Sequence, residues 1–208
     1  MFAPDTPQIY LVTPPVFHVA SFAPRLAGVL DAVPVACVRL ALTGETDLDP
    51  NLPQTADILR DLTHTRDVPL VVTQHADLAL RHGLDGVHLT DGARRVRKTR
   101  AALGADAIVG AFCETSRHAG MTAGEAGADY IAFGPVGNTG LGDNVMAEQG
   151  LFAWWSEMIE LPVVAEGALT TDLVETLAPV TDFFAVGAEI WRAEDAVATL
   201  LELTTPLR

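Results

Sequence analysis

Three stretches decide the fold of this chain: LDGVHL at residues 84–89, GADYIAFGPVGNTG at residues 127–140 and PVVAEGAL at residues 162–169. Each contains a short apolar run without polar alternation, and each run is followed by glycine or a polar residue. Such runs are typical of strands buried on both faces, as in a parallel sheet covered by helices. The residues that follow each run are candidates for ligand contacts.

Eight such runs alternate with segments of helical period along the chain. The predicted strands are 9–13, 35–42, 70–73, 86–89, 107–112, 130–134, 163–166 and 183–186. The predicted helices are 20–30, 54–65, 77–82, 93–103, 117–126, 148–160, 171–177 and 193–203. This alternation favours a single-domain α/β protein, a (β/α)₈ TIM barrel spanning residues 1–208, because a doubly wound sheet usually has fewer units.

The charge balance limits the classes of partner that the protein is expected to bind. The chain has 13 Lys+Arg against 27 Asp+Glu, a formal net charge of −14, which argues against nucleic acid or an anionic membrane. No apolar run approaches the roughly 18 residues of a membrane helix, and the start lacks the features of a signal peptide, so we expect a cytoplasmic protein. Cys37 and Cys113 stand far apart and form no zinc-binding spacing.

Lysine is nearly absent. Lys98 is the single lysine, and it lies in a segment that reads as an exposed outer helix with four arginines. Schiff-base chemistry needs a desolvated lysine amine in a pocket. Lysine aldolases and pyridoxal enzymes are therefore excluded.

The deciding stretches resemble those of the thiamine phosphate synthase family and its relatives, the thiazole tautomerases. LDGVHL, GADYIAFGPVGNTG and PVVAEGAL follow in the family's order, and YLVT at 10–13 and PLVVTQHADLAL at 69–80 support the match. The resemblance runs from about Tyr10 to Trp191. It implies a TIM barrel and a magnesium-assisted reaction that joins a pyrimidine pyrophosphate to a thiazole phosphate with loss of pyrophosphate.

At the positions that hold magnesium in the family, this chain departs from the pattern. Gln74 and Ala93 stand where the family has aspartates. A neutral amide is a much poorer magnesium ligand than a carboxylate. Asp91, two residues before Ala93, is the one candidate to replace them. We therefore expect Mg²⁺ as a cofactor only if synthase activity is retained.

The positions that contact pyrophosphate in the family also differ. Ala41, Gly142 and Phe112 replace two lysines and a serine, whereas Arg39 is retained. Losing one transition-state donor or cation costs on the order of 3 kcal/mol. The resemblance, with these departures, predicts a poor or inactive synthase in which Arg39 is the main anion contact, joined by Thr139 in the loop after the sixth strand.

The thiazole phosphate of the family is held by backbone amides after the seventh and eighth strands. The matched positions here are Gly167, Ala168, Gly187 and Ala188. Two carboxylates, Glu166 and Glu189, stand beside these positions, where the family pattern does not place them. They add negative charge to an expected phosphate site.

Three residues are candidate catalytic groups: Glu114, Glu166 and His75. Glu114 takes the place of the acid-base histidine of the tautomerases, and a carboxylate with a raised pKa can transfer protons. The alternative for Glu114 and Glu166 is that both are solvated loop residues. The alternative for His75 is a loop histidine that packs against its neighbour, and for His75 we favour this alternative. Within the fold, we expect His88 to hydrogen-bond inside the barrel and Cys113 to be inert.

The function that these features favour is a thiamine-phosphate-synthase-like protein of thiamine biosynthesis. Its expected ligand is a small phosphorylated or heteroaromatic metabolite, bound under a mobile glycine-rich lid formed by GPVGNTGLGDN. Two alternatives stay open: a non-catalytic barrel that binds a metabolite or a protein, and a glutamate-based isomerase or tautomerase. A barrel of this size often presents helices for a homodimer.

Overall fold

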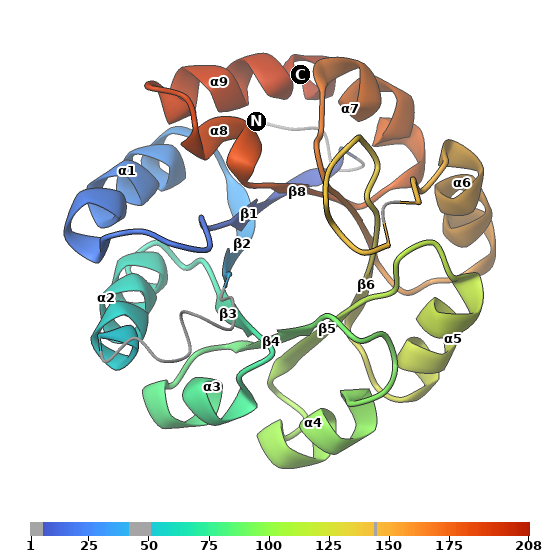
Figure 1. Ribbon diagram of the computed structural model, residues 1–208, viewed down its shortest axis with the longest axis horizontal. Coiled ribbons are helices and arrows are strands. Elements are labelled where there is room, and N and C mark those ends of the chain that lie inside the picture. Colours follow the sequence, from blue (N-terminus) through green and yellow to red (C-terminus); the bar gives the residue numbers. More distant parts are fainter. Residues whose placement is uncertain (1–5, 42–50, 144) are drawn as a thin grey trace.

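Eight parallel strands form a closed ring in which each strand pairs with the next along the chain and β8 returns to β1. The structure, a computed structural model, describes residues 6–41, 51–143 and 145–208. Figure 1 shows the barrel end-on, with the strands inside and the helices outside. The strands are β1 Gln8–Val12, β2 Val35–Leu40, β3 Leu70–Thr73, β4 Gly86–Leu89, β5 Ile108–Phe112, β6 Tyr130–Phe133, β7 Val163–Glu166 and β8 Phe183–Val186.

Helices cover the outside of the ring, and the first seven strands are each followed by one of them. They are α1 Val19–Ala32, α2 Leu52–His64, α3 Ala76–His82, α4 Val96–Leu103, α5 Arg117–Glu125, α6 Gln149–Met158 and α7 Thr171–Leu177. Two helices, α8 Ala188–Trp191 and α9 Ala196–Leu203, follow β8. The fold is therefore the predicted TIM barrel with one short extra helix.

Alternation along each strand separates two apolar clusters. In β1, Ile9 and Leu11 belong to the large cluster between strands and helices, whereas Tyr10 belongs to a smaller cluster inside the barrel. Gly110 on β5 makes room for that interior, because a Cβ there would lie 2.0 Å from Cζ of Tyr130. Both strand faces are buried, which is why the strands lack a polar alternation in sequence.

Aspartates brace the amino-terminal end of the barrel at three places. Asp85, Asp129 and Asp182 each directly precede an even-numbered strand. Their Oδ2 atoms accept backbone N–H bonds from the preceding strands: from Leu70 at 2.6 Å, from Val109 at 2.6 Å and from Val163 at 2.8 Å. These carboxylates satisfy strand-edge donors, so their role is structural.

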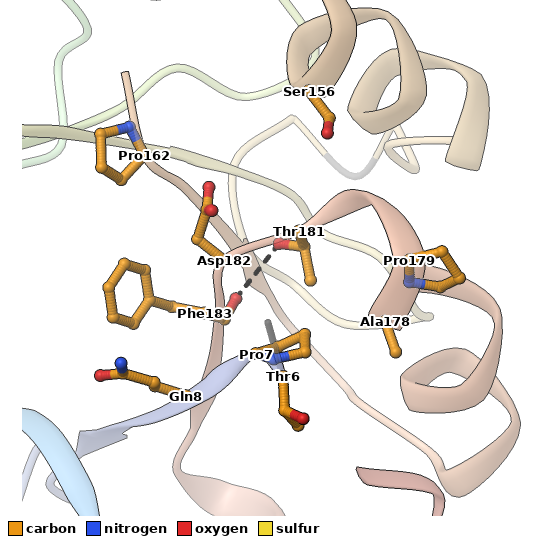
Figure 2. A pocket seen from close by; sticks show the side chains of 10 residues that line it. All are labelled: Thr6, Pro7, Gln8, Ser156, Pro162, Ala178, Pro179, Thr181, Asp182 and Phe183. Atoms are coloured by element: carbon orange, nitrogen blue, oxygen red, sulfur yellow. Dashed lines mark hydrogen bonds between the residues drawn. The ribbon is translucent and has the colours of Figure 1, made fainter. Parts of the chain in front are cut away.

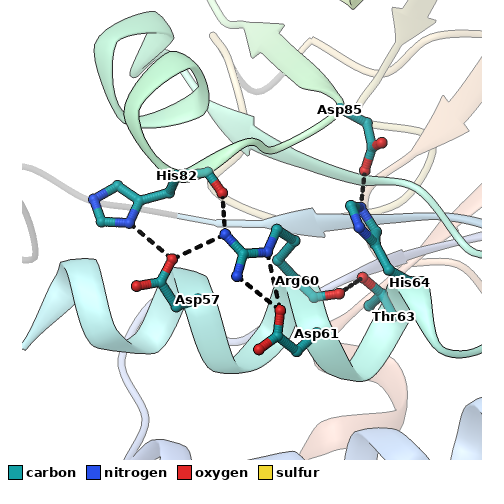
Figure 3. Close-up of polar contacts among 7 residues, drawn as sticks. All are labelled: Asp57, Arg60, Asp61, Thr63, His64, His82 and Asp85. Atoms are coloured by element: carbon teal, nitrogen blue, oxygen red, sulfur yellow. Dashed lines mark hydrogen bonds and ion pairs between the residues drawn. The ribbon is translucent and has the colours of Figure 1, made fainter.

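Two histidine–aspartate pairs on the outside of the barrel join α2 to the end of α3 and to the residue before β4 (Figure 3). His82 Nδ1 lies 2.9 Å from Asp57 Oδ1, and His64 Nε2 lies 2.8 Å from Asp85 Oδ2. Arg60 donates to Asp57 and to the carbonyl oxygen of His82. The hydrogen bond from His82 lowers the pKa of Asp57. These titratable groups serve helix packing.

A pocket of about 400 Å³ opens at the amino-terminal end, between β1, β8 and the helices beside them (Figure 2). Prolines and small polar residues line it, among them Pro7, Pro162, Pro179 and Thr181. Thr181 Oγ1 is already engaged with the carbonyl oxygens of Val163 and Phe183. Ligand sites of TIM barrels lie at the opposite end, so this pocket is not the candidate site.

The predicted elements are all present, with shifted ends. Helix α4 begins at Val96 instead of residue 93, because the chain turns through Arg94 and Arg95 first. Strand β2 ends at Leu40, and the predicted end at residue 42 lies outside the described residues. Helix α8 was not predicted. Within the described ranges, no helix combines the length and hydropathy needed to cross a membrane.

Candidate functional site

The centre of the site is an ion pair inside the barrel, between Arg39 on β2 and Glu166 on β7. The pair is bidentate: Arg39 Nη1 donates to Glu166 Oε2 at 3.0 Å, and Nη2 donates to Oε1. Arg39 is 6% exposed and Glu166 7% exposed. The retained arginine therefore lies where it was predicted, but a carboxylate of the chain already occupies its fork.

Arg39 stays charged in this setting. Burial is the largest single effect and opposes its protonation, but the charge and hydrogen bonds of Glu166, together with Tyr10 and Tyr130, outweigh burial and raise the pKa of Arg39 above its ordinary value. Its Nε atom is buried and has no hydrogen-bond partner. An unpaired buried donor is uncommon in folded proteins and calls for an explanation. Here the unpaired N–H lies beside the ion pair, inside the barrel.

A cation–π contact and two hydrogen bonds connect this pair to further side chains in the barrel interior. The Arg39 guanidinium lies 5.8 Å from the centre of the Tyr10 ring. Tyr10 Oη and Tyr130 Oη are 2.7 Å apart, and Tyr130 Oη is 2.9 Å from His88 Nδ1. Burial, with a smaller contribution from Arg39, lowers the pKa of His88 well below its ordinary value. His88 therefore stays neutral and has the structural role predicted for it.

Burial also protects both tyrosines from ionisation. It raises the pKa of Tyr10 and of Tyr130, and for Tyr10 the neighbouring Tyr130 adds to the effect. The interior thus carries one guanidinium and one carboxylate, joined to neutral hydroxyl and imidazole groups. This arrangement pairs the two buried charges with each other, and Nε of Arg39 is the one polar side-chain atom of the pair without a hydrogen-bond partner.

Glu189, at the start of α8, occupies the backbone amides after β7 and β8. Its Oε2 accepts from the N–H of Gly187 at 2.8 Å, and its Oε1 accepts from the N–H of Leu169 at 3.1 Å. Gly167 and Ala168 have left-handed backbones with φ of 101° and 51°, which shapes the turn after β7. Of the four residues predicted to bind phosphate, Gly187 thus has its N–H bonded to a carboxylate of the chain.

The loop between β6 and α6 packs against the mouth of the barrel. Leu141 contacts the apolar cluster inside the barrel, which includes Phe112. A Cβ on Gly142 would lie 3.4 Å from side-chain atoms of Glu114 and of Phe112. The loop thus packs over the barrel mouth and brings an apolar side chain to the position next to the family's lysine; residue 144 of the predicted lid lies outside the described residues.

A pocket of about 390 Å³ lies beside the mouth, between the loops that follow β4 and β5. Glu114 lines it, is exposed, and has a left-handed backbone with φ of 52°. Asp91 also lines it: its Oδ2 accepts from Arg95 Nε at 2.7 Å, and its buried Oδ1 has no partner. Glu114 is therefore a solvated loop residue, which was one of the two alternatives for it. Glu166 is buried and does not fit that alternative.

Of the three positions considered for magnesium, Gln74, Ala93 and Asp91, only Asp91 carries a carboxylate. The described residues contain no group of three or more His, Cys, Asp or Glu side chains that could hold a metal. Asp91 is committed on one side to Arg95, and Gln74 hydrogen-bonds with Arg95 and Thr90. The oxygen left without a partner at these positions is Oδ1 of Asp91.

The remaining predicted residues lie around the same mouth. His75 is the N-cap residue of α3 and is half-buried, and Thr139 is half-buried in the loop after β6. Ala188 is the first residue of α8. Burial, with a smaller contribution from Glu114, raises the pKa of the Cys113 thiol to about 12, so Cys113 is the inert residue that was predicted.

Three residues of the site were not identified from the sequence. Tyr10 and Tyr130 complete the interior hydrogen bonds, and Leu141 covers the mouth. The sequence did contain a signal for the two tyrosines, because each stands at an inward-facing position of a predicted strand. The arginine-rich outer helix was also only partly a solvated surface, because Arg100 binds the carbonyl oxygen of Gly127 and the carboxylate of Asp129.

The fold defines a class: the TIM barrels, in which ligand sites lie at the carboxyl ends of the strands. Residues 9–190 match the model of the thiamine monophosphate synthase family. The chain therefore belongs to the thiamine monophosphate synthase family.

Individual relatives agree with this assignment. The chain is 42% identical to a thiamine-phosphate synthase of Rhodospirillum centenum, over 88% of this chain and 89% of that protein. It is 34% identical to one of Erythrobacter litoralis, over 92% and 91%. A thiamine phosphate pyrophosphorylase structure from Pyrococcus furiosus superposes with a TM-score of 0.78 at 23% identity, over 96% and 95% of the two chains, which supports the fold.

Proposed function

We propose that this chain acts in thiamine biosynthesis by binding a thiazole or a related heteroaromatic metabolite at the barrel mouth, and that it does not transfer a pyrimidine group with loss of pyrophosphate. Family membership and the relatives named thiamine-phosphate synthase support the place in thiamine biosynthesis. The departure from the synthase reaction rests on the site itself.

The observation that carries the proposal is the bidentate Arg39–Glu166 pair. A leaving pyrophosphate needs cations that are free to take up its growing negative charge. The guanidinium of Arg39 gives both of its terminal nitrogens to Glu166, and the approach of a polyanion would bring negative charge against that buried carboxylate.

The walls of the mouth support a heteroaromatic ligand. Phe112 lines the pocket beside the mouth, Leu141 packs against the apolar cluster that includes Phe112, and the buried Nε of Arg39 has no hydrogen-bond partner. Sites for small ligands combine mostly apolar walls with a few placed polar groups. A ring with nitrogen or sulfur atoms fits such walls through stacking and a single hydrogen bond.

The proposal predicts no synthase turnover. Purified protein is incubated with the pyrimidine pyrophosphate, the thiazole phosphate and magnesium, and thiamine phosphate is followed by chromatography. We expect no product above a reaction without protein, whereas turnover in the usual range of about 1–10³ per second would refute the proposal.

The same preparation is screened by thermal shift against thiazole compounds, thiamine compounds and pyrophosphate, each with and without magnesium. We expect stabilisation by a thiazole compound that does not depend on magnesium, since ligands that bind only the folded state raise the melting temperature. Stabilisation by none of the heteroaromatic compounds would contradict the binding part of the proposal.

A further inference from the structure

The loops after β7 and β8 are where TIM barrels frequently bind phosphate, with the help of a short extra helix. This chain has that helix, α8, and its residue Glu189 accepts hydrogen bonds from the two N–H groups of Gly187 and Leu169. One carboxylate oxygen takes each amide, at 2.8 and 3.1 Å. The side chain thus holds the amides that an external anion would need.

An independent observation repeats this arrangement inside the barrel. Arg39, buried under the mouth, has its two terminal nitrogens on Glu166. Two groups that could bind an anion are therefore each bonded to a glutamate of the same chain. The pair of backbone amides binds Glu189, and the guanidinium binds Glu166. Of the guanidinium nitrogens, Nε alone has no hydrogen-bond partner among the described residues.

We propose that Glu189 is a specificity-determining residue that excludes phosphate, so that the mouth selects a heteroaromatic ligand with a free hydroxyl over the phosphate ester of the same ligand. A phosphate entering the loops after β7 and β8 would have to displace the Glu189 carboxylate and then remain beside it. Like charges at such short range repel each other strongly. A hydroxyl carries no charge and leaves the carboxylate in place.

This inference rests on the proposed function only in placing the ligand at the barrel mouth. The walls that would face the ring, Phe112 and Leu141, are uncharged and tolerate either form of the ligand. The choice between alcohol and ester therefore depends on Glu189 and, more deeply in the barrel, on Glu166. Changing Glu189 alone isolates its contribution.

The test compares a thiazole that carries a hydroxyl with its phosphate ester, by titration calorimetry against the full chain. For the unchanged protein we expect the alcohol to bind at least about tenfold more tightly, a difference of about 1.4 kcal/mol. Glu189→Ala should strengthen binding of the ester by about tenfold or more and leave the alcohol within about twofold. Glu189→Gln removes the charge with little change in size, and should move the ester in the same direction.

Glu194→Ala is the matched control, because Glu194 is an exposed glutamate just after α8. It should change neither affinity, which separates loss of the local carboxylate from a change in net charge. Melting curves of the variants verify folding, and Glu189→Gln serves if Glu189→Ala does not fold.

The outcomes separate the two proposals. If the unchanged protein prefers the ester, or if the ester gains no affinity in either Glu189 variant, the role of Glu189 is refuted while binding at the mouth stands. If neither compound binds the unchanged protein or the variants, both the proposed function and the role of Glu189 fail.

Discussion

At the scale of single residues, the site is governed by how Arg39 is neutralised. Buried charges are tolerated only when they are paired, and the price of breaking a buried pair comes mostly from the charge left behind. Arg39 and Glu166 have 8% and 9% of their side chains exposed, so water cannot replace a lost partner. Their coupling is therefore the feature of the site that is most accessible to measurement.

We expect Arg39→Met and Glu166→Leu each to lower the free energy of unfolding by about 3–5 kcal/mol, because each leaves the opposite charge buried alone. The double variant should recover most of this loss, since it leaves no unpaired charge. Denaturant unfolding of the four proteins measures the coupling. Losses that simply add would contradict a coupled buried pair.

At the scale of elements, the two ends of the strands are specialised in different ways. The carboxyl ends carry unusual backbones: Gln74, Glu114 and Ala168 follow β3, β5 and β7, and all three have positive φ. Such strain is kept where the surrounding structure enforces it, often at functional sites. The amino ends carry Asp85, Asp129 and Asp182, which cap strands instead.

We expect Asp182→Ala to lower the free energy of unfolding by about 1–3 kcal/mol, because the buried N–H of Val163 loses its charged acceptor. Asp182→Asn keeps an acceptor oxygen and should lose less. Ligand binding at the mouth should not change, since Asp182 lies at the opposite end of the barrel. Chemical denaturation and calorimetry test this.

Glu175→Ala on the exposed face of α7 is the control for the Asp182 variants, and should stay within about 0.5 kcal/mol of the unchanged protein. An Asp182→Ala protein as stable as this control would remove the capping role.

At the scale of the whole molecule, the closed barrel makes its interior titrate only when the molecule unfolds. His88 is 1% exposed, and its pKa in the folded protein lies well below 6.5. In the unfolded chain, His88 has its ordinary pKa of about 6.5. At a pH between the pKa of the folded protein and this ordinary value, the unfolded chain binds a proton at His88 and the folded chain does not. Stability therefore falls as the pH drops below about 6.5, with a slope of up to about 1.4 kcal/mol per pH unit.

We expect His88→Gln to remove this part of the pH dependence, although the variant itself is less stable at neutral pH because Tyr130 loses its imidazole partner. The free energy of unfolding, measured between pH 7 and about pH 5, gives the slope for each protein. His118→Gln, at an exposed position on α5, is the control. Equal slopes in the unchanged protein and in His88→Gln would contradict the assignment.

The sequence by itself determined the barrel, the order of its elements, and the residues at the mouth. This was possible because hydrophobic period and chain order are local properties, and because a parallel barrel places the residue after each strand at one end. The predictions for Arg39 and His88 came from the resemblance to the family, and the prediction for Cys113 came from the lack of a cationic neighbour.

Only the tertiary structure decided which groups neutralise one another. Glu166 lies 127 residues from Arg39, and nothing in their local sequence indicates that the β2 guanidinium meets the β7 carboxylate. Glu189 is close in sequence to Gly187, but its second bond, to the amide of Leu169, exists because β7 and β8 are neighbours in the ring. Hydrogen bonds depend on distance and direction in space, and the closed ring sets both.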